Sequence, residues 1–420
     1  MIRLALTLFS ISQHLIFKFL FCVSVVVFSV YRLVIQFYRK YFHHHQHHDH
    51  DGKQTSNHAI VWNKLIRHAV VQNLKSVTSF RQASRRYIPL LYPPLEAPYF
   101  GCASKIEKID RLRNSYWITM KTHHHFGASK DHSPLNSTQK VMLFIHGGGF
   151  ISGHPIGLDA QSVLYAINDF NKSNSSIKCS HVLSVEYRLN EDPKHYSTMD
   201  RNILCETLDD QVQDCFDCFM YLIEELKIPA KDIILGGYSA GANHCMNLVL
   251  HKLLPMVLKK DTLRENLQVW PIHAVSLFSA PCDISNTIIS NDQWRHENVL
   301  VLTKGMVDLI HMCVSVPDKL KYSILKNIKD MEEEYGDEFW DTLLQTKRWI
   351  INYSNHEELT PGNEYLVDLF RKKIQQFEST HPHVVCSVVN EDHQMHCYTT
   401  AYAVLPEAKR SMKTIMKCCF

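Results

Sequence analysis

Residues 231–243 read KDIILGGYSAGAN, an apolar run that leads directly into a glycine-flanked serine and then into helix-forming residues. Within it, Gly237-Tyr238-Ser239-Ala240-Gly241 fits the pattern G-x-S-x-G, which places a serine on a cramped strand-to-helix turn. Flanking glycines let neighbouring backbone approach where a Cβ would collide. The pattern predicts an exposed nucleophile, Ser239, at the amino end of a helix whose free N–H groups face any anion that forms there.

A second glycine-rich motif, His146-Gly147-Gly148-Gly149-Phe150, follows the apolar run KVMLFI. Acyl transfer needs preplaced hydrogen-bond donors, because its tetrahedral intermediate carries an oxyanion, and an HGGG-type loop supplies them in lipases and esterases. We predict that the amides of Gly148, Gly149 and Ala240 form such an oxyanion hole. His146 is expected to support the loop rather than to carry a proton.

Short β-rich runs alternate with helix-length segments along the chain. This alternation, with near-continuous apolar strands, predicts an α/β fold with a mainly parallel central sheet covered on both faces. The expected helices include 214–227 and 364–378. The expected strands are 115–121, 140–150, 180–190, 231–243, 272–281, 348–354 and 383–389.

Three motifs, taken in this order, resemble the hormone-sensitive-lipase-like group of α/β-hydrolases. They are HGGGF (146–150), VEYRLNEDPKHY (185–196) and GGYSAGAN (236–243). The resemblance covers roughly residues 115–405 and implies an α/β-hydrolase fold. There are departures: Tyr238 replaces the usual aspartate before the nucleophile, Ala242 replaces a glycine, and Asn190-Glu191-Asp192 stands for Ala-Pro-Glu. These departures lie outside the positions of the catalytic triad. They concern the range of substrates and the residues that support the loops around the site.

A catalytic triad in this fold follows the order serine, acid, histidine. The expected strand at 348–354 leads into Asn355-His356-Glu357-Glu358-Leu359, and the family's D/E-x-L turn implies Glu357 as the acid, with Glu358 as the alternative. Asp283, in SAPCDIS, resembles a segment whose aspartate is not the catalytic one.

The histidine of the triad is implied by the segment HVVCSVVNEDHQMHCY. The family's acidic turn followed by a histidine selects His396, with His393 as the alternative. In the implied mechanism His396 takes the proton of Ser239, which attacks an ester or amide carbonyl, and Glu357 orients the imidazolium. Water then deacylates the serine, and no metal or organic cofactor is implied.

The amino-terminal part of the chain differs from the rest. Residues 11–31 are 21 mostly apolar residues, enough to cross a hydrocarbon core of about 30 Å. No small-residue cleavage signature follows them, which indicates an uncleaved transmembrane anchor. We therefore predict an anchor at 1–42, a His-rich linker at 43–55 and an α/β-hydrolase domain at 56–420. Helix-like segments near 59–110 and 287–345 are expected to form a helical cap over the carboxyl edge of the sheet.

Composition excludes other classes of protein. The chain has 45 Lys and Arg against 42 Asp and Glu, a net charge of +3, which is too small to indicate a nucleic-acid surface. Its 13 cysteines lack the spacing of a zinc module and the density of a disulfide scaffold. Cys215 and Cys218 are expected to be ordinary thiols, and the tract FHHHQHHDHD (42–51) is expected to be a solvated linker rather than a metal site.

An anchor ahead of such a domain makes the chain resemble the endoplasmic-reticulum arylacetamide deacetylases and the fungal steryl acetyl hydrolases. This resemblance implies a serine esterase that removes acetyl or short acyl groups from lipophilic alcohols such as sterols, which partition into the membrane beside the enzyme. Two alternatives remain open. One is a non-catalytic ligand receptor on the same fold, against which the retained Ser239, Glu357 and His396 count; the other is an amide or formamide hydrolase.

Two signals disagree on the side of the membrane that the domain occupies. Arg32, Arg39 and Lys40 follow the span, which by the positive-inside rule favours the cytosol. Four N-x-S/T acceptors favour the lumen, namely Asn136, Asn171 and Asn174 in polar, loop-like stretches and Asn352 in an expected buried strand. With the resemblance to lumenal deacetylases, we expect a single-pass protein of the endoplasmic reticulum membrane with a lumenal catalytic domain.

Overall fold

The structure is a computed structural model that describes residues 102–121, 139–173, 177–259, 268–284, 304–355, 357–392, 394, 396–402 and 405–420. All of these residues belong to one compact unit of the chain. The expected anchor and His-rich linker lie outside the described residues. Within the described ranges, no helix is both long and apolar enough to cross a membrane.

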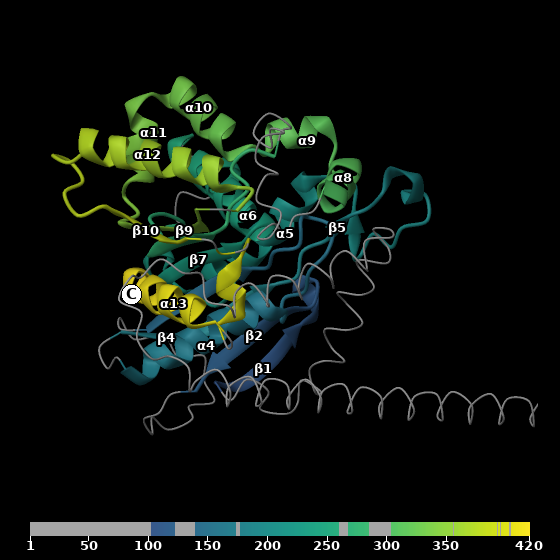
Figure 1. The fold of residues 1–420 in the computed structure, drawn as a ribbon, viewed down its shortest axis with the longest axis horizontal. Helices are drawn as coiled ribbons and strands as arrows, with labels where there is room; N and C mark the ends of the chain where they lie inside the picture. Colours follow the sequence, from purple (N-terminus) through teal and green to yellow (C-terminus); the bar gives the residue numbers. More distant parts are fainter. Residues whose placement is uncertain are drawn as a thin grey trace, which may run out of the picture. The chain divides into compact units, whose positions relative to one another are not determined.

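An eight-stranded sheet forms the centre of the described unit (Figure 1). Its strand order is β1-β2-β4-β3-β7-β8-β9-β10. The six strands from β4 to β10 in this order are mutually parallel. At the other end of the sheet, β2 pairs with both β1 and β4 in antiparallel fashion. The strands are β1 (Ala103–Ile109), β2 (Ser115–Met120), β3 (Gln139–Ile145), β4 (Lys178–Val185), β7 (Ile233–Tyr238), β8 (Ala274–Phe278), β9 (Arg348–Ser354) and β10 (Val385–Glu391). The predicted α/β-hydrolase fold with a mainly parallel sheet is confirmed, and each of the seven predicted strands is present.

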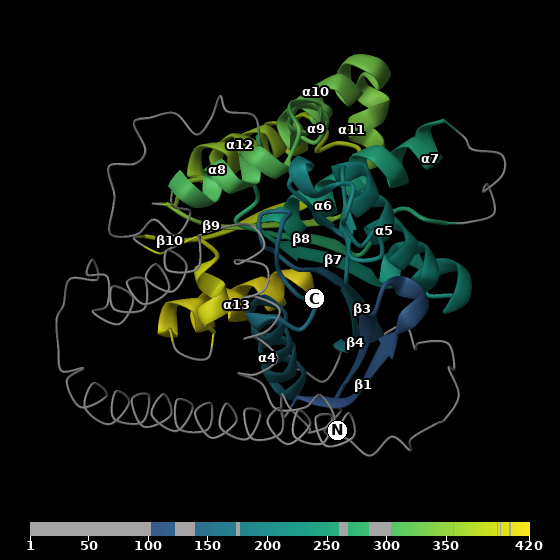
Figure 2. The same ribbon diagram turned by 90° about the vertical axis from the view of Figure 1, so that its right-hand side faces the viewer.

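Helices cover both faces of this sheet (Figure 2). Helices α4 (Leu158–Ser173) and α13 (Pro406–Cys419) contact one another and cover one face. Helices α5 (Leu208–Met220), α6 (Ala240–Leu248) and α12 (Thr360–Gln376) cover the other. Because the central parallel strands are buried on both faces, they are mostly apolar, as in β3, where Val141 to Ile145 are all buried.

The sequence analysis did not predict strand β1. The expected first cap segment, 59–110, includes these residues, whereas Ala103–Ile109 pairs with β2 at the edge of the sheet. Lys105, Glu107 and Lys108 interrupt its apolar pattern. An edge strand has a neighbour on one side only and tolerates such charges, so its periodicity is weak. The rest of that segment, up to residue 101, lies outside the described residues.

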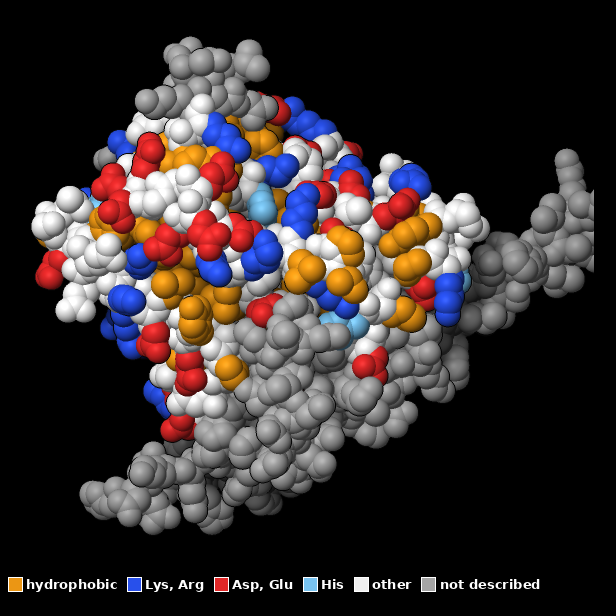
Figure 3. Space-filling model, turned by 90° about the horizontal axis from the view of Figure 1, so that it is seen from above, with side chains coloured by type: hydrophobic (Ala, Val, Ile, Leu, Met, Phe, Trp, Pro, Cys, Tyr) orange, Lys and Arg blue, Asp and Glu red, His pale blue; other side chains and the backbone are white. Residues whose placement is uncertain are grey.

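Short helices occupy the described part of the second cap segment. They are α8 (Lys304–Cys313), α9 (Val316–Lys321), α10 (Ile324–Tyr335) and α11 (Asp337–Leu343). They lie on the same side of the sheet as α12 (Figure 1). Seen from that side, the basic and acidic side chains of the described residues are interspersed with apolar ones (Figure 3).

The remaining elements are short. Helix α7 (Leu254–Leu258) follows a π-helical turn, Val249–Leu253, that continues α6, and a similar turn, Tyr221–Glu225, continues α5. Strands β5 (Leu189–Asn190) and β6 (Leu204–Cys205) form a separate parallel pair.

One predicted glycosylation site is wrong. Asn171 lies in the last turns of α4 and is buried, not in a polar loop. Its Nδ2 donates to the carbonyl of Cys179 at 2.8 Å, and its Oδ1 accepts from the amide of Cys179 at 3.1 Å. A side-chain amide held in this way is not available for a glycan. Asn352 is buried in β9, as the sequence predicts, and Asn136 and Asn174 lie outside the described residues.

Candidate active site

Ser239 lies at a strained turn between β7 and α6. Its φ of 49° and ψ of −118° fall in a region that side-chain-bearing residues rarely adopt. The flanking glycines make the turn possible: a Cβ on Gly237 would collide with the backbone of Gly241, and one on Gly241 would collide with the carbonyl of Ile145 at the end of β3. The G-x-S-x-G spacing is therefore a packing requirement, and it leaves the serine at the carboxyl edge of the sheet.

His396 and Glu357 come to Ser239 from two other strand ends. His396 lies in the loop after β10, and its Nε2 is 2.9 Å from Ser239 Oγ. Its Nδ1 is 3.3 Å from Oε2 of Glu357, which lies in the turn after β9. The His396 and Glu357 side chains are 7% and 0% exposed. The three residues thus form a continuous chain of contacts from a buried carboxylate to a serine hydroxyl.

The structure also separates the two candidate acids. The carboxylate in contact with His396 Nδ1 is that of Glu357, not that of its neighbour Glu358, although both residues are buried. The amide of Glu357 bonds the carbonyl of Ser354, and Thr360 Oγ1 donates to the carbonyls of both Ser354 and Glu357. These bonds close a tight turn that sends the side chain of Glu357 toward the histidine. His393, the alternative base, lies outside the described residues.

Cys397 is a residue of the site that the sequence analysis did not find. Its Sγ lies 3.4 Å from Nε2 of His396, the same nitrogen that faces Ser239. Burial raises the pKa of the Cys397 thiol, which favours the neutral form, and His396 partly opposes this shift. The only sequence signal was its place directly after the histidine.

The pKa of His396 is shifted by opposing effects. Burial lowers it, but the Cys397 thiol and the Glu357 carboxylate raise it more strongly, so that the pKa lies well above the ordinary value of 6.5. A carboxylate next to an imidazole favours the protonated ring, which is the form that arises when the ring takes a proton from a nucleophile.

The three-glycine loop lies against the serine. A Cβ on Gly147 would stand 3.4 Å from the Cβ of Ser239, so the loop and the turn are in close contact. Gly148 and Gly149 follow with φ of 125° and 61°, values that favour glycine. Ala240 is the first residue of α6, where an N–H has no partner within the helix. The structure thus places the start of the loop against Ser239, with Gly148 and Gly149 directly after the contact at Gly147 and Ala240 directly after the serine.

Asp159, on α4, holds the start of this loop. Its Oδ2 accepts from the amide of Gly147 at 2.8 Å, and its Oδ1 accepts from the amide of Ala160 at 3.0 Å. Burial raises the pKa of Asp159, and these two hydrogen bonds oppose the shift. His146 is fully buried, stacks on Tyr187 with ring centroids 4.3 Å apart, and has its Nδ1 2.7 Å from the carbonyl of Gly147. These are structural contacts of the kind that the sequence predicts for His146.

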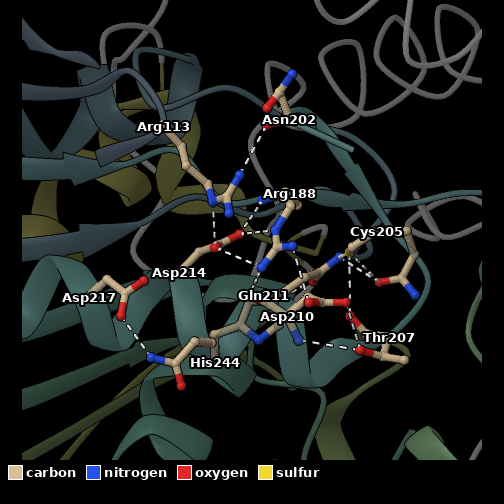
Figure 4. Close-up of polar contacts among 12 residues, drawn as sticks. Arg113, Arg188, Asn202, Cys205, Thr207, Asp210, Gln211, Asp214, Asp217 and His244 are labelled. Atoms are coloured by element: carbon tan, nitrogen blue, oxygen red, sulfur yellow. Dashed lines mark hydrogen bonds and ion pairs between the residues drawn. The ribbon is translucent and has the colours of Figure 1, made fainter. Parts of the chain in front are cut away.

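A polar network behind the loop explains the VEYRLN motif (Figure 4). Asp214, buried on α5, accepts from the backbone amide and Nε of Arg188 at 3.0 and 2.9 Å and from Arg113 Nε at 2.6 Å. This anchors the chain at Arg188, and two residues later the amide of Asn190 bonds the carbonyl of Phe150 at 2.9 Å.

The same carbonyl is held from α5 as well. It accepts from Nε2 of Gln211 at 2.9 Å, while Oε1 of Gln211 bonds Nε2 of His244 at 2.8 Å. Burial lowers the pKa of His244 to about 3, so this ring is neutral. The network therefore fixes the end of the glycine loop without adding a charge near Ser239.

Apolar side chains also pack beside the serine. Phe150, Ala240 and Ile284 form one buried cluster with Val314 and Tyr322, which flank α9. Among the described residues, no group of three or more His, Cys, Asp or Glu side chains could hold a metal ion. Cys215 and Cys218 are buried free thiols, and Cys218 Sγ lies 3.5 Å from Ser115 Oγ.

Fold and site together define this protein as an α/β-hydrolase with the layout of a serine esterase. A comparison with protein-family models matches residues 16–397 to the family described as steryl acetyl hydrolase. The chain belongs to the steryl acetyl hydrolase family. No curated protein matches the sequence.

Solved structures of esterases have the same fold. An esterase from the hyperthermophilic archaeon Pyrobaculum calidifontis is 14% identical, with 86% of this chain and 96% of that chain covered and a TM-score of 0.55. An esterase of the bacterial hormone-sensitive lipase family is 15% identical, with coverages of 87% and 98% and a TM-score of 0.57. A hormone-sensitive lipase from a metagenome library is 14% identical, with coverages of 86% and 97% and a TM-score of 0.54.

Proposed function

We propose that this member of the steryl acetyl hydrolase family uses Ser239, His396 and Glu357 as a catalytic triad to remove acetyl groups from sterols. The observation that carries the proposal is the unbroken series of contacts from Glu357 Oε2 through the His396 ring to Ser239 Oγ, at 3.3 and 2.9 Å. A buried carboxylate, an imidazole and a serine on a strained turn, in this order, form the arrangement that activates a hydroxyl as a nucleophile.

The proposed reaction has two halves. His396 Nε2 takes the proton of Ser239 Oγ as the oxygen attacks the ester carbonyl, and Glu357 stabilises the imidazolium. The amides of Gly148, Gly149 and Ala240 donate to the oxyanion. The imidazolium then protonates the departing sterol oxygen, which leaves acetyl on Ser239. A water, deprotonated by His396, attacks the acetyl group and releases acetate, which restores the free serine.

A lipophilic substrate is supported by the surroundings of the serine and by the sequence. Phe150, Ile284 and Val314 give an apolar wall next to Ala240. Helices α8 to α11 are the described part of the proposed helical cap. The proposed transmembrane anchor at 1–42 would hold the enzyme where a steryl ester partitions.

The test uses the purified full-length protein in detergent, with cholesteryl acetate and p-nitrophenyl acetate as substrates and Ser239→Ala as the matched variant. We expect both substrates to be cleaved by the wild type alone, and a fluorophosphonate probe to label the wild type alone. Probe labelling without steryl acetate cleavage would contradict the sterol substrate and retain the esterase; cleavage of an amide or formamide instead would identify that class. Binding of a small ligand with neither labelling nor turnover would favour a receptor.

The proposed location is the endoplasmic reticulum membrane, with a single span and the catalytic domain in the lumen. The acceptor sites Asn136 and Asn174 provide the test. Endoglycosidase treatment of the microsomal protein should increase its mobility, and this shift should disappear when both asparagines are replaced. Asn171 and Asn352 are buried, so their replacement should not change the glycan. Digestion of the domain by protease in sealed microsomes would place it in the cytosol instead.

A further inference from the structure

Ser279 is a buried serine directly after β8, at the same edge of the sheet as the triad. It is 0% exposed, and its φ of 50° lies in the region that favours glycine. Its amide donates to the carbonyl of Asn352 on β9 at 2.7 Å, which holds it between two strand ends. A serine in a backbone conformation that suits glycine indicates that the hydroxyl itself is needed there.

The hydroxyl of Ser279 joins the two loops that carry the acid and the base. Its Oγ lies 2.8 Å from Oε2 of Glu357 and 3.1 Å from the backbone nitrogen of Cys397. The N–H of Cys397 can only donate, so the Ser279 oxygen accepts from it. The single hydroxyl proton of Ser279 therefore points at the carboxylate of Glu357.

The bond to Ser279 falls on the oxygen of Glu357 that matters for the triad. Oε2 also faces Nδ1 of His396, at 3.3 Å, while Oε1 has no hydrogen-bond partner among the described residues. The Ser279–Glu357 bond is the shorter of the two bonds to Oε2. The orientation of the carboxylate toward His396 is thus set by Ser279 as much as by the histidine itself.

We infer that Ser279 is a positioning residue for the triad: its hydroxyl aims Oε2 of Glu357 at His396 and ties down the backbone just after that histidine. This inference rests on the proposed catalytic triad. It places three segments in one hydrogen-bonded unit, since Ser279 is 78 residues from Glu357 and 118 residues from Cys397 in the chain.

The test compares Ser279→Ala with Ser279→Gly, Ser279→Cys and the control Ser276→Ala. Alanine removes the hydroxyl, glycine removes it and relieves the backbone, and cysteine keeps the shape with a weaker donor. Ser276 is a fully buried serine of β8, three residues earlier, with no bond to the triad. We expect Ala and Gly to lower kcat for p-nitrophenyl acetate by about 10- to 100-fold with KM nearly unchanged, Cys to be intermediate, and Ser276→Ala to match the wild type.

A second measurement separates positioning from stability. The proton on Nδ1 of His396 gives a low-field NMR resonance when it is shared with a carboxylate, and this resonance should broaden or move upfield in Ser279→Ala and Ser279→Gly but not in Ser276→Ala. If Ser279→Ala fails to fold, the glycine and cysteine variants decide. Inactivity of Ser239→Ala would establish Ser239 as the nucleophile. If Ser279→Gly then had the kcat of the wild type and an unchanged resonance, the positioning role of Ser279 would be overturned. Activity retained by Ser239→Ala would instead overturn the proposed function.

Discussion

The two halves of the candidate site are built in different ways. Ser239 and the glycine loop depend on steric contact: Gly147, Gly237 and Gly241 bring three backbone segments so close that a Cβ at any of them would press on its neighbour. Glu357 and His396 depend on hydrogen bonds between loops that are 39 residues apart in the chain. The nucleophile side should therefore be sensitive to added volume, and the acid–base side to the loss of a charge or of a hydrogen-bond donor.

The largest expected effect is on the acid–base side, at His396. His396→Ala removes the side chain whose Nε2 contacts Ser239 Oγ and accepts its proton, so kcat for p-nitrophenyl acetate should fall by roughly 10⁴- to 10⁶-fold. His393→Ala should remain within about threefold of the wild type, because the triad contacts are made by His396. Equal losses in the two variants would mean that the wrong histidine has been assigned.

The next effect compares two adjacent carboxylates. Glu357→Gln keeps the shape of the side chain but removes the charge that stabilises the imidazolium, so kcat should fall by about 10³- to 10⁴-fold. Glu358→Gln should have a mild effect, since Glu358 does not contact the His396 ring. Circular dichroism of both variants serves as the folding control. A large loss of kcat in Glu358→Gln would instead assign Glu358 as the catalytic acid.

On the nucleophile side, added volume should be the damaging change. A Cβ on Gly148 would collide with the backbone oxygen of Ser152, at a φ of 125° that disfavours alanine. Gly148→Ala should displace a proposed oxyanion donor and lower kcat by about 10²- to 10³-fold. The matched control is Gly336→Ala, which also has a positive φ but lies in open space, so it should lower the unfolding temperature and leave kcat unchanged. Similar kcat losses would show that backbone strain alone is responsible.

The smallest effect is a shift of the pH profile. A base must be neutral to accept the Ser239 proton, and the pKa of His396 is raised above 6.5, so kcat/KM should rise with pH along an acid limb whose midpoint lies above 6.5. Glu357→Gln removes the carboxylate that raises this pKa, so the midpoint of its residual activity should lie at lower pH than in the wild type. Initial rates measured from about pH 5 to 9 test this, and a wild-type midpoint below 6.5 would contradict the assignment.

Local patterns in the sequence predict most strands of the central sheet. Each of the seven predicted strands is present, and the central ones are recognisable because a parallel strand buried on both faces is a nearly continuous apolar run, as in ILGGY and KVMLFI. Edge strand β1 was not predicted, because it pairs on one side only and tolerates charged residues, which weaken its apolar pattern. Asn171 was misplaced because the polar stretch NKSNSS begins inside the last turn of a helix, where hydrogen bonding rather than composition decides burial.

The strand-to-helix turn at Ser239 and the three-glycine loop are predictable from the sequence alone, because both are fixed by backbone sterics within a few consecutive residues. The sequence limits the acid to Glu357 or Glu358 and the base to His396 or His393. The choice of Glu357 and His396 depends on the resemblance to the family. The three-dimensional arrangement was needed to show that Glu357 contacts the imidazole of His396, and that Ser279 and Cys397 lie beside this pair. The physical reason is that a hydrogen bond between loops depends on where strand ends converge, and that distance has no local signature in the chain.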